Sequence, residues 1–452
     1  MQTLEGVKLI KDIEQKFDVM SIKYKGVSVW PFLRIYLKES VTTKRENRAS
    51  ASNIGLVLKS LFVYNPLSIF KRHQVWVFTA SDRRKCIGGK MVHRISGGIT
   101  ACSYRTLMIE KPVKGTGHYK RSAIEEEDII SESWLLMTFH ALEVFARMAK
   151  PRLQNEDVLR RILGEYDLQF NYLRFVRILN AQRLAMRLLL KIASRPKLVT
   201  MECPYDSMGY LWAFHEKGIK VVEMQHGSLN GNHIAYNGKA YEPKMNPDCI
   251  CVFGEEEYNY FTREETQYAK EVRMTGLYML EMADNYFKED IFIEDRRAYQ
   301  SVVVVSGQPV YEELLSHFID QIAAEYNSLL FVYIPRRATE NIKFQSKNAC
   351  WVTNVNIYEY LKWADIHMTI SSSTCLEAQY FHTPTIFYNY NHISENYLNG
   401  ILKEENGAFF VTSAAEFGLA YKKICNTAFM FRELFAYGNK ERIKHLISDY
   451  LS

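Results

Sequence analysis

The chain has 452 residues and a mass of 52.8 kDa, which exceeds one ordinary hydrophobic core and predicts two domains of roughly 200 residues each. Hydrophobic residues make up 47% of it and charged residues 24%, which excludes a mainly disordered, collagen-like or low-complexity protein. The net charge of +6 conceals an asymmetry, because residues 1–240 carry 38 Lys and Arg against 22 Asp and Glu, whereas residues 241–452 carry 19 against 29.

The first half of the chain predicts short apolar strands that alternate with helices. An opening helix precedes a helical turn at Trp30-Pro31, and the polar stretch 42–53 is expected to be a loop. Residues 124–195 place apolar side chains at three- and four-residue spacing, which predicts a mostly helical insert. The expected strands are 75–80, 106–111, 197–202, 220–224, 249–254 and 272–276.

The second half repeats this alternation, and a helix over 431–451 is expected to close the chain. Continuous apolar strands separated by helices predict parallel sheets covered on both faces. The expected fold class is therefore α/β, with two Rossmann-like domains whose ligands bind at the strand carboxyl ends, in the cleft between them. We expect domains 1–285 and 286–452, with the last helix a candidate to cross back to the first. The expected strands are 301–307, 329–335, 351–355, 365–373 and 383–389.

The segment KVVEMQHGSLNGNHIAY (220–236) carries the strongest local signal. The candidate acceptor or cleft residues that follow its strand are Gln225, Gly227, His233 and Tyr236, together with His226. Polar side chains past the carboxyl end of a strand suit a ligand cleft, and a glycine there permits close backbone approach. His226 is a candidate to transfer a proton or to hydrogen-bond a phosphate or sugar hydroxyl; alternatively, it satisfies loop carbonyls.

Two carboxylates lie at the exit of the strand before it. Glu202 and Asp206 are candidates for a general base that acts on an acceptor hydroxyl, or for a group that stabilises an oxocarbenium-like centre. The structural alternative is that Asp206 caps the helix that begins near Ser207.

In the second half, TISSSTCLEA (369–378) follows a strand and opens a helix. Hydroxyls and backbone N–H groups at that position suit a phosphate, and the residues that offer them are Ser371, Ser372, Ser373 and Thr374. Because Glu377 lies three residues after Thr374, a capping box is the competing explanation, and both can hold together.

Two further loops are candidates for the same anionic ligand. Residues 306–309, with Gln308, leave the first strand of the second half as a second phosphate loop. At the exit of the next strand, Arg336 and Arg337 place two guanidinium groups where a diphosphate or carboxylate would lie.

Several absences narrow the functional class. The sequence has no GxGxxG, GxxxxGK[ST], DxD or HExxH motif, so dinucleotide, P-loop and metal-dependent readings lack support, and we expect neither a metal nor a cofactor. The eight cysteines form no C-x-x-C pair and, with no secretory signal, are expected to be reduced in the cytoplasm. The basic first half predicts an anionic partner, for which a membrane surface or lipid-linked phosphate is favoured over nucleic acid.

These features together resemble GT-B glycosyltransferases. The residues that carry the resemblance are YKGVSVWPFLRIYL (24–37), VWVFTASDRRKCIGGK (75–90), EMQHG and NHIAY (223–236), and ADIHMTISSSTCLEAQYFHTPTIFY (364–388). Within that group the chain is most similar to bacterial capsule and lipopolysaccharide enzymes, including Kdo and sialic-acid transferases that use CMP-activated sugars. One departure is YIPRRATEN (333–341), where related CMP-sugar transferases often carry a His-Pro pair.

The resemblance implies a metal-independent glycosyltransferase, cytoplasmic or peripheral on the inner membrane. Its second domain would bind a nucleotide-sugar donor, with Ser371 to Thr374 at the phosphate and Glu377 at a ribose or as a structural cap. Its first domain would bind a glycan or lipid-linked acceptor, and Gln225 and His226 would border the transfer site. The alternatives are a CDP-alditol phosphotransferase, a sugar-nucleotide 2-epimerase, or a non-catalytic glycan-binding assembly protein of similar fold.

Overall fold

The computed structural model divides the chain into two contact units. Unit 1 comprises residues 1–84, 90–276 and 438–452, and unit 2 comprises residues 85–89 and 277–437. The structure describes residues 2–42, 51–113, 117–147, 150–227, 229, 231, 233–238, 240–263, 266–336, 342–398 and 400–452, without the side chains of 2–4, 42 and 51–54. The expected boundary is 285/286, and the contacts divide the chain at 276/277. The helix α10 (Tyr278–Tyr286) packs against unit 2, where Lys362 Nζ donates to Asp284 O at 2.6 Å.

Unit 1 is built on a parallel sheet. Within the described residues it has seven strands in the order β11-β10-β9-β8-β3-β6-β7. The strands are β3 (Val75–Ala80), β6 (Thr106–Lys111), β7 (Ile129–Ser131), β8 (Leu198–Met201), β9 (Lys220–Met224), β10 (Cys249–Val252) and β11 (Glu271–Met274). Since the first strand along the chain lies inside the sheet, the order reverses between β3 and β8, as in a Rossmann-like fold.

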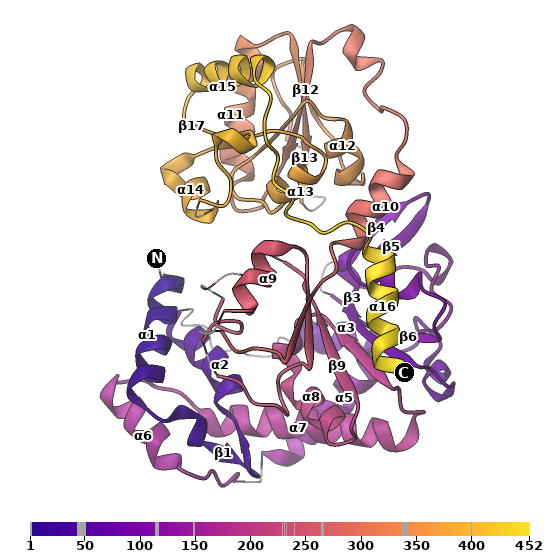
Figure 1. The fold of residues 1–452 in the computed structure, drawn as a ribbon, viewed down its shortest axis with the longest axis vertical. Coiled ribbons are helices and arrows are strands. Elements are labelled where there is room, and N and C mark those ends of the chain that lie inside the picture. Colours follow the sequence, from indigo (N-terminus) through magenta and orange to yellow (C-terminus); the bar gives the residue numbers. More distant parts are fainter. Residues whose placement is uncertain are drawn as a thin grey trace. The chain divides into compact units, whose positions relative to one another are not determined.

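Helices pack against the faces of this sheet and bury them (Figure 1). Apolar side chains of α5, α7 and α8 form one core cluster with β3, β6 and β8. The helices of unit 1 are α1 (Gln2–Lys16), α2 (Trp30–Thr42), α3 (Ala51–Ser60), α4 (Gly97–Thr100), α5 (Ser133–Ala146), α6 (Glu156–Glu165), α7 (Tyr172–Ile192), α8 (Met208–His215), α9 (Glu255–Phe261) and α16 (Asn439–Leu451). Gly209 lets α8 approach α7 closely, because a Cβ there would collide with the Leu179 carbonyl oxygen.

The C-terminal helix α16 belongs to unit 1. Asn439 Nδ2 donates to Thr275 O at 2.9 Å, where the helix begins. Arg273 pairs with Asp449 at 2.5 Å, and Tyr450 donates to Glu271 at 2.8 Å near its end. Further contacts with α4 and β8, and a hydrogen bond from Lys197 to Leu451 O at 3.0 Å, show that α16 packs across unit 1.

Unit 2 has the same strand order as the core of unit 1. Its described strands form a parallel sheet in the order β14-β13-β12-β15-β16-β17, which reverses between β12 and β15. They are β12 (Ser301–Ser306), β13 (Leu329–Ile334), β14 (Ala349–Trp351), β15 (Ile366–Thr369), β16 (Thr385–Tyr388) and β17 (Ala408–Val411). Helices α11 (Glu312–Glu325) and α15 (Ala414–Asn426) pack on one face, and α12 (Ile357–Trp363) and α13 (Thr374–Tyr380) lie on the other (Figure 1). The expected fold class, two parallel α/β sheets in one chain, is thus confirmed.

Several element predictions need correction. The short strands β7 and β17 were not predicted, and β14 ends before most of the expected strand 351–355. The closing helix begins at Asn439, not at 431, because Gly438 takes a φ of 75° and ends the preceding extended segment. Of the loop expected over 42–53, residues 43–50 lie outside the described residues, while 51–53 belong to α3.

Candidate active site

The candidate site of unit 1 lies at the point where its strand order reverses. Ligands of open α/β sheets bind at the carboxyl ends of the strands beside such a reversal. Here Thr79 lies near the end of β3, and Glu202 follows β8 directly. The neighbouring Cys203 takes a left-handed φ of 53°, an uncommon conformation for a residue with a Cβ. The chain therefore turns sharply directly after Glu202.

Glu202 is held by hydrogen bonds through one oxygen only. Its Oε1 accepts from Ser96 Oγ at 2.8 Å and from Thr79 Oγ1 at 3.3 Å. Its Oε2 is buried and has no hydrogen-bond partner among the described residues, and it faces Arg83 Nε at 3.9 Å. One oxygen therefore fixes the orientation of the carboxyl, while the other can exchange a proton.

A neutral imidazole completes this arrangement. Burial lowers the pKa of His93 to about 3, so the ring carries no charge at neutral pH. His93 Nδ1 accepts from the Ser96 backbone N–H at 3.1 Å, which leaves Nε2 to donate to the Thr79 hydroxyl. The Thr79 hydroxyl is then free to donate to Glu202.

The pKa of Glu202 suits proton transfer. Burial raises the pKa of Glu202 to about 7, against a smaller opposing effect from the Arg83 cation and the hydroxyl donors. A general base works best when its pKa lies near the operating pH. Glu202 is thus a carboxyl that can both lose and accept a proton at neutral pH, and one of its oxygens has no hydrogen-bond partner among the described residues.

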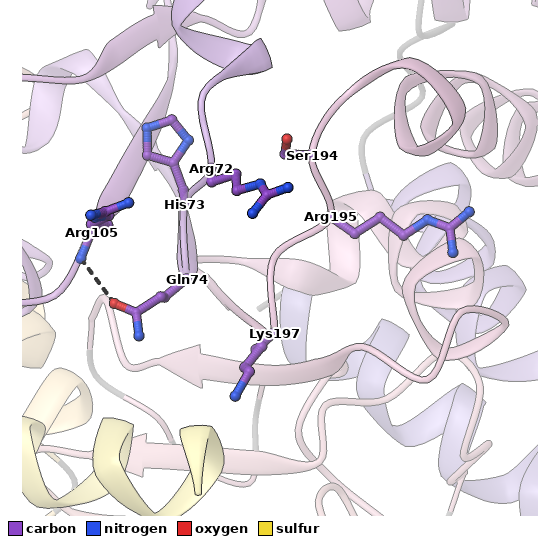
Figure 2. A pocket seen from close by; sticks show the side chains of 7 residues that line it. All are labelled: Arg72, His73, Gln74, Arg105, Ser194, Arg195 and Lys197. Atoms are coloured by element: carbon purple, nitrogen blue, oxygen red, sulfur yellow. Dashed lines mark hydrogen bonds between the residues drawn. The ribbon is translucent and has the colours of Figure 1, made fainter.

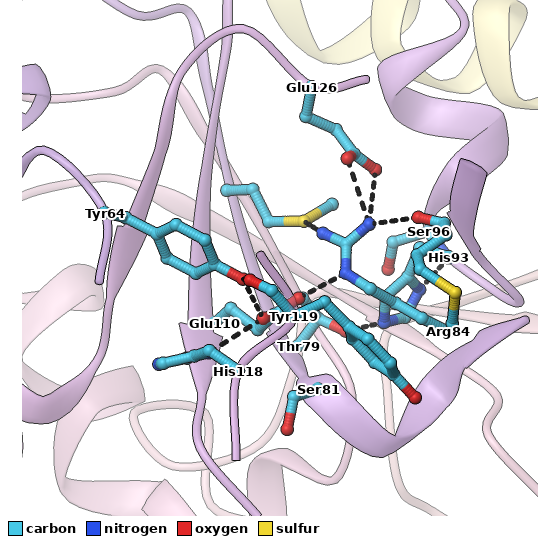
Figure 3. A network of polar contacts seen from close by, with 12 residues as sticks. Tyr64, Thr79, Ser81, Arg84, His93, Ser96, Glu110, His118, Tyr119 and Glu126 are labelled. Carbon is cyan, nitrogen blue, oxygen red and sulfur yellow. Dashed lines mark hydrogen bonds and ion pairs between the residues drawn. The ribbon is translucent and has the colours of Figure 1, made fainter. Parts of the chain in front are cut away.

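Arg83 is positioned by a buried network around the residue that follows it (Figure 3). Arg84 donates to Glu110 at 2.5 Å and to both oxygens of Glu126 at 3.0 and 3.1 Å. Glu110 also accepts from Tyr64 at 3.0 Å. Because Arg84 is fixed in the interior, the side chain of Arg83 is directed to the other side, where Nη1 donates to His226 O at 3.1 Å.

The predicted histidines lie in an aromatic cluster next to Arg83. The ring of Tyr205 lies 6.1 Å from that of His226 and 5.3 Å from that of His233. Burial is the main cause that lowers the pKa of His226 to about 3 and that of His233 to about 4. Each has a buried Nδ1 without a partner among the described residues. Both are therefore neutral hydrogen-bonding groups, and the cationic acid form is disfavoured.

Of the other residues predicted in unit 1, Gln225 and Tyr236 make hydrogen bonds within the fold, and Asp206 is exposed. The amide of Gln225 donates to Gly227 O at 2.9 Å and Glu257 at 3.0 Å, so it anchors the loop that follows β9. Tyr236 points into the core and donates to Glu223 at 2.5 Å. Asp206 is exposed in a short 3-10 helix and makes no cap hydrogen bond to α8 through its side chain.

In unit 2, a second polar network lies where that sheet reverses. Ser306, at the end of β12, hydrogen-bonds His367 Nε2 at 2.8 Å and Thr374 Oγ1 at 2.7 Å. Thr374 Oγ1 lies 2.8 Å from Ser372 Oγ. Burial lowers the pKa of His367 to about 3, so this network of hydroxyls and one imidazole is uncharged.

The other predicted donor-binding residues are distributed around this network. Gln308 bridges the two loops, since its Nε2 donates to Ser371 O at 2.9 Å and its Oε1 accepts from the Ser371 N–H and hydroxyl. Glu377 is buried in α13, whose N-cap residue is Ser373 without a side-chain cap, so the expected capping box is not formed. Arg336 is exposed after β13, and Arg337 lies outside the described residues.

Metal-ion clusters and membrane-spanning helices are both absent from the part of the chain that the structure describes. They contain no group of three or more His, Cys, Asp or Glu side chains placed to hold a metal ion. None of the described helices combines the length and apolar character needed to cross a membrane.

Comparisons with known proteins give structural likenesses only. No protein-family model and no curated protein matches the chain. The UDP-GlcNAc 2-epimerase of Methanocaldococcus jannaschii is similar over 83% of this chain and 99% of its own, at 10% identity and a TM-score of 0.49. The Neisseria meningitidis UDP-GlcNAc 2-epimerase, solved with UDP-GlcNAc, gives the same coverages and identity at 0.45. The α,α-trehalose 6-phosphate synthase of Burkholderia multivorans matches 84% and 95% of the two chains, at 11% and 0.42. The fold assignment therefore rests on the strand orders of the two sheets.

Several residues of these two networks are not among those predicted from the sequence. They are Thr79, Arg83, His93, Ser96 and His367. The one available signal was a polar side chain inside or just after an apolar strand, as in VWVFTASDR and DIHMT. Such a residue is expensive to bury without a partner, so it marks a network even when its partners are distant in sequence.

Proposed function

We propose that this chain is a glycosyltransferase that moves a sugar from a nucleotide-activated donor to a glycan or lipid-linked acceptor in bacterial surface polysaccharide synthesis. The observation that carries the proposal is the environment of Glu202. A buried carboxyl with a pKa of about 7 and one unpartnered oxygen lies where an α/β sheet binds its ligands.

In this proposal Glu202 is the general base. Its Oε2 takes the proton of an acceptor hydroxyl, whose oxygen forms the new bond to the anomeric carbon of the donor sugar. The bond from that carbon to the nucleotide phosphate breaks, and the phosphate leaves with the electron pair. Arg83 stabilises the ionised carboxylate before the reaction, and the neutral His226 serves to orient hydroxyl groups.

Unit 2 is the proposed nucleotide-binding part. The hydroxyl groups of Ser372, Ser373 and Thr374, with Arg336 and Arg337, are the proposed partners of the departing phosphate. An uncharged network accepts this anion without like-charge repulsion. The resemblance in sequence implies a CMP-activated ulosonic acid as donor. UDP-GlcNAc, the ligand of the Neisseria structure, is the contrasting candidate.

The charge distribution favours a transfer reaction over one that needs a single substrate. The excess of Lys and Arg over Asp and Glu in residues 1–240 suits an anionic acceptor, such as a charged glycan or a lipid-linked phosphate. A 2-epimerase acts on the sugar nucleotide alone and needs no such surface.

Sugar-nucleotide 2-epimerisation remains the second candidate, because the free oxygen of Glu202 would equally suit removal of a C–H proton beside the anomeric carbon. A CDP-alditol phosphotransferase would use the same base on an acceptor hydroxyl and yield a phosphodiester. The three reactions differ in product: a glycoside with free nucleotide, an epimerised sugar nucleotide, or a phosphodiester.

The decisive experiment combines ligand binding with product analysis. Thermal unfolding of the full chain is followed with CMP, CDP, UDP and GDP, with and without divalent metal, and a ligand at 100 times its Kd stabilises by about 2.7 kcal/mol. The stabilising nucleotide then selects the activated sugars, whose products are identified by mass spectrometry and NMR. A glycoside that forms with wild type but not with Glu202→Gln supports the proposal. Absence of stabilisation by every nucleotide contradicts it and favours the glycan-binding alternative.

A further inference from the structure

The amino-terminal edge of the first sheet carries a basic pocket, away from the strand carboxyl ends that hold Glu202. The pocket has a volume of about 650 Å³ (Figure 2). Its cations are Arg72, Arg105, Arg195 and Lys197, which lie just before β3, β6 and β8. All four side chains are exposed. Among the described carboxylates, none pairs with any of them, so this edge presents four uncompensated positive charges.

Unit 1 also exposes large apolar side chains, some of which adjoin this pocket. The most exposed are Phe62, Leu67 and Phe70, which precede β3, Val144 and Phe145 at the end of α5, and Ile192 at the end of α7. Phe70 and Ile192 lie close to the pocket in sequence, and Phe70 does so through a contact as well. Ser194, which lines the pocket, donates to Phe70 O at 3.3 Å, and Arg72 and Arg195 follow Phe70 and Ile192 within three residues.

Contacts with neighbouring residues hold some of these apolar side chains at the surface. Trp134, in the first turn of α5, donates to Leu61 O at 2.8 Å, and its ring centroid lies 5.2 Å from that of Phe62 in a T-shaped arrangement. The exposed stripe of α5 consists of residues 134, 137, 141, 144 and 145, which share one helical face and include no charged residue. The opposite face of α5 packs in the core, and apart from the contacts of Trp134 with Leu61 and Phe62 the side chains of this stripe are exposed.

We propose that this basic–apolar surface, formed by the four cations and the six apolar side chains named above, docks the protein on an anionic phospholipid membrane. Aromatic and aliphatic side chains would enter the interface, while the pocket would take anionic headgroups. A second copy of the chain is a poorer occupant, because a two-fold contact through this surface would bring the same four cations together. A free anion would account for the pocket but not for the apolar stripe beside it.

Vesicle flotation of the full chain tests this directly. We expect binding to vesicles of phosphatidylcholine with 30% phosphatidylglycerol (roughly the anionic share at which basic segments are attracted), weaker binding to phosphatidylcholine alone, and release by high salt. Binding needs neither donor nor acceptor, so a negative result here leaves the proposed reaction untouched.

Matched variants locate the surface. Phe62→Ser with Phe145→Ser should lower vesicle affinity by at least about tenfold, because each substitution removes an aromatic ring from the apolar area that would enter the interface. The control pair is Met430→Ser with Leu419→Ser in unit 2. Its side chains are 73% and 68% exposed, against 73% and 69% for Phe62 and Phe145, and it should bind like wild type.

A second pair of double variants tests whether vesicle binding depends on the cations of this surface or on the net charge of the protein. Arg105→Gln with Arg195→Gln should weaken binding about 25-fold, at about fivefold for each cation. Arg160→Gln with Arg161→Gln on α6 makes the same change in net charge away from the surface and should bind like wild type within about twofold.

Three results would overturn the proposal. The first is no binding to anionic vesicles, and the second is equal loss in test and control pairs. The third is a concentration-dependent dimer, or tight oligonucleotide binding, that the surface variants abolish while vesicle binding is absent.

Discussion

The two points of sheet reversal share a backbone plan and differ in one chemical group. In each unit the first strand of the sheet has a hydroxyl residue at or next to its end, Thr79 or Ser306, that hydrogen-bonds a neutral, buried histidine, His93 or His367. In unit 1 the hydroxyl leads on to the carboxyl of Glu202. In unit 2 it leads on to further hydroxyls.

This difference separates two chemical tasks that the same framework supports. A buried carboxyl with a pKa of about 7 can accept a proton, but its negative charge would repel a phosphate. An uncharged set of hydroxyls can receive a phosphate but has no group of suitable pKa for proton transfer. The role proposed for each unit therefore depends on the group that joins the hydroxyl and the histidine, which is Glu202 in unit 1 and further hydroxyls in unit 2. It does not depend on the fold, which the two units share.

The largest expected effect concerns the carboxyl itself. Glu202→Gln should lower turnover by about 10²- to 10⁴-fold, the usual contribution of a general base, with the protein still folded. Steady-state kinetics with the donor that the nucleotide-binding and product experiment selects measures it.

Glu223→Gln is the matched control for that variant. Glu223 lies on the adjacent strand, is buried, and has a pKa raised to about 8, but Tyr236 and Tyr268 donate to its two oxygens. Turnover should stay within a few-fold of wild type. Equal losses in both variants would mean that burial of any carboxyl in this sheet, and not proton transfer by Glu202, matters for activity.

The same carboxyl should make stability depend on pH. Because folding raises the pKa of Glu202 from 4.5 to about 7, the native state binds more protons in that range, and stability is lost as pH rises through it. Glu202→Gln should remove up to about 3 kcal/mol of this loss between pH 4.5 and 7.5. Urea unfolding of both proteins at the two pH values measures the difference; Glu223 and Glu257 titrate with the same sign in both and cancel.

In unit 2 the expected effect is on nucleotide affinity. Thr374→Val preserves the side-chain shape but removes the hydroxyl that joins Ser306 to Ser372, and should weaken nucleotide binding about tenfold. Thr383→Val removes a buried hydroxyl that donates to Leu361 O, at a different place in the unit. It should cost stability and leave the Kd unchanged. Calorimetry that found equal Kd changes would place the phosphate elsewhere.

The smallest expected effect is a shift in pH dependence. The Arg83 cation lowers the pKa of Glu202, so Arg83→Gln should move the rising limb of kcat/KM to higher pH. Arg94→Gln should move it less, because Arg94 is the weakest of the causes that act on Glu202. A shift to lower pH, or none, would show that the limb belongs to another group.

Most of the secondary structure could be predicted because apolar strands of a parallel sheet are continuous in sequence. Runs such as 75–80 and 301–306 need no distant information. The strands β7 and β17 were missed since each has only three or four residues and lies beside other short apolar segments. The extra residues in the predicted closing helix were helical in pattern, but Gly438 interrupts them.

The candidate site was predictable only in part. Glu202 could be found because it directly follows an apolar strand, and the Ser371–Thr374 segment because it joins a strand to a helix. Asp206 and Gln225 occupy equally suggestive positions in the sequence, yet one is exposed and the other is used to anchor a loop. Position after a strand identifies the edge of the sheet but not the direction or the partners of a side chain.

The sequence by itself determined the class of the fold, the basic character of the first half and the segments that lie at the strand carboxyl ends, since periodicity, charge and strand ends are local properties. Only the tertiary structure brought Thr79, Ser96 and Arg83 to Glu202, across more than 100 residues of chain. The protonation behaviour of that carboxyl depends on burial and on the charges around it. Both arise only when distant segments pack together.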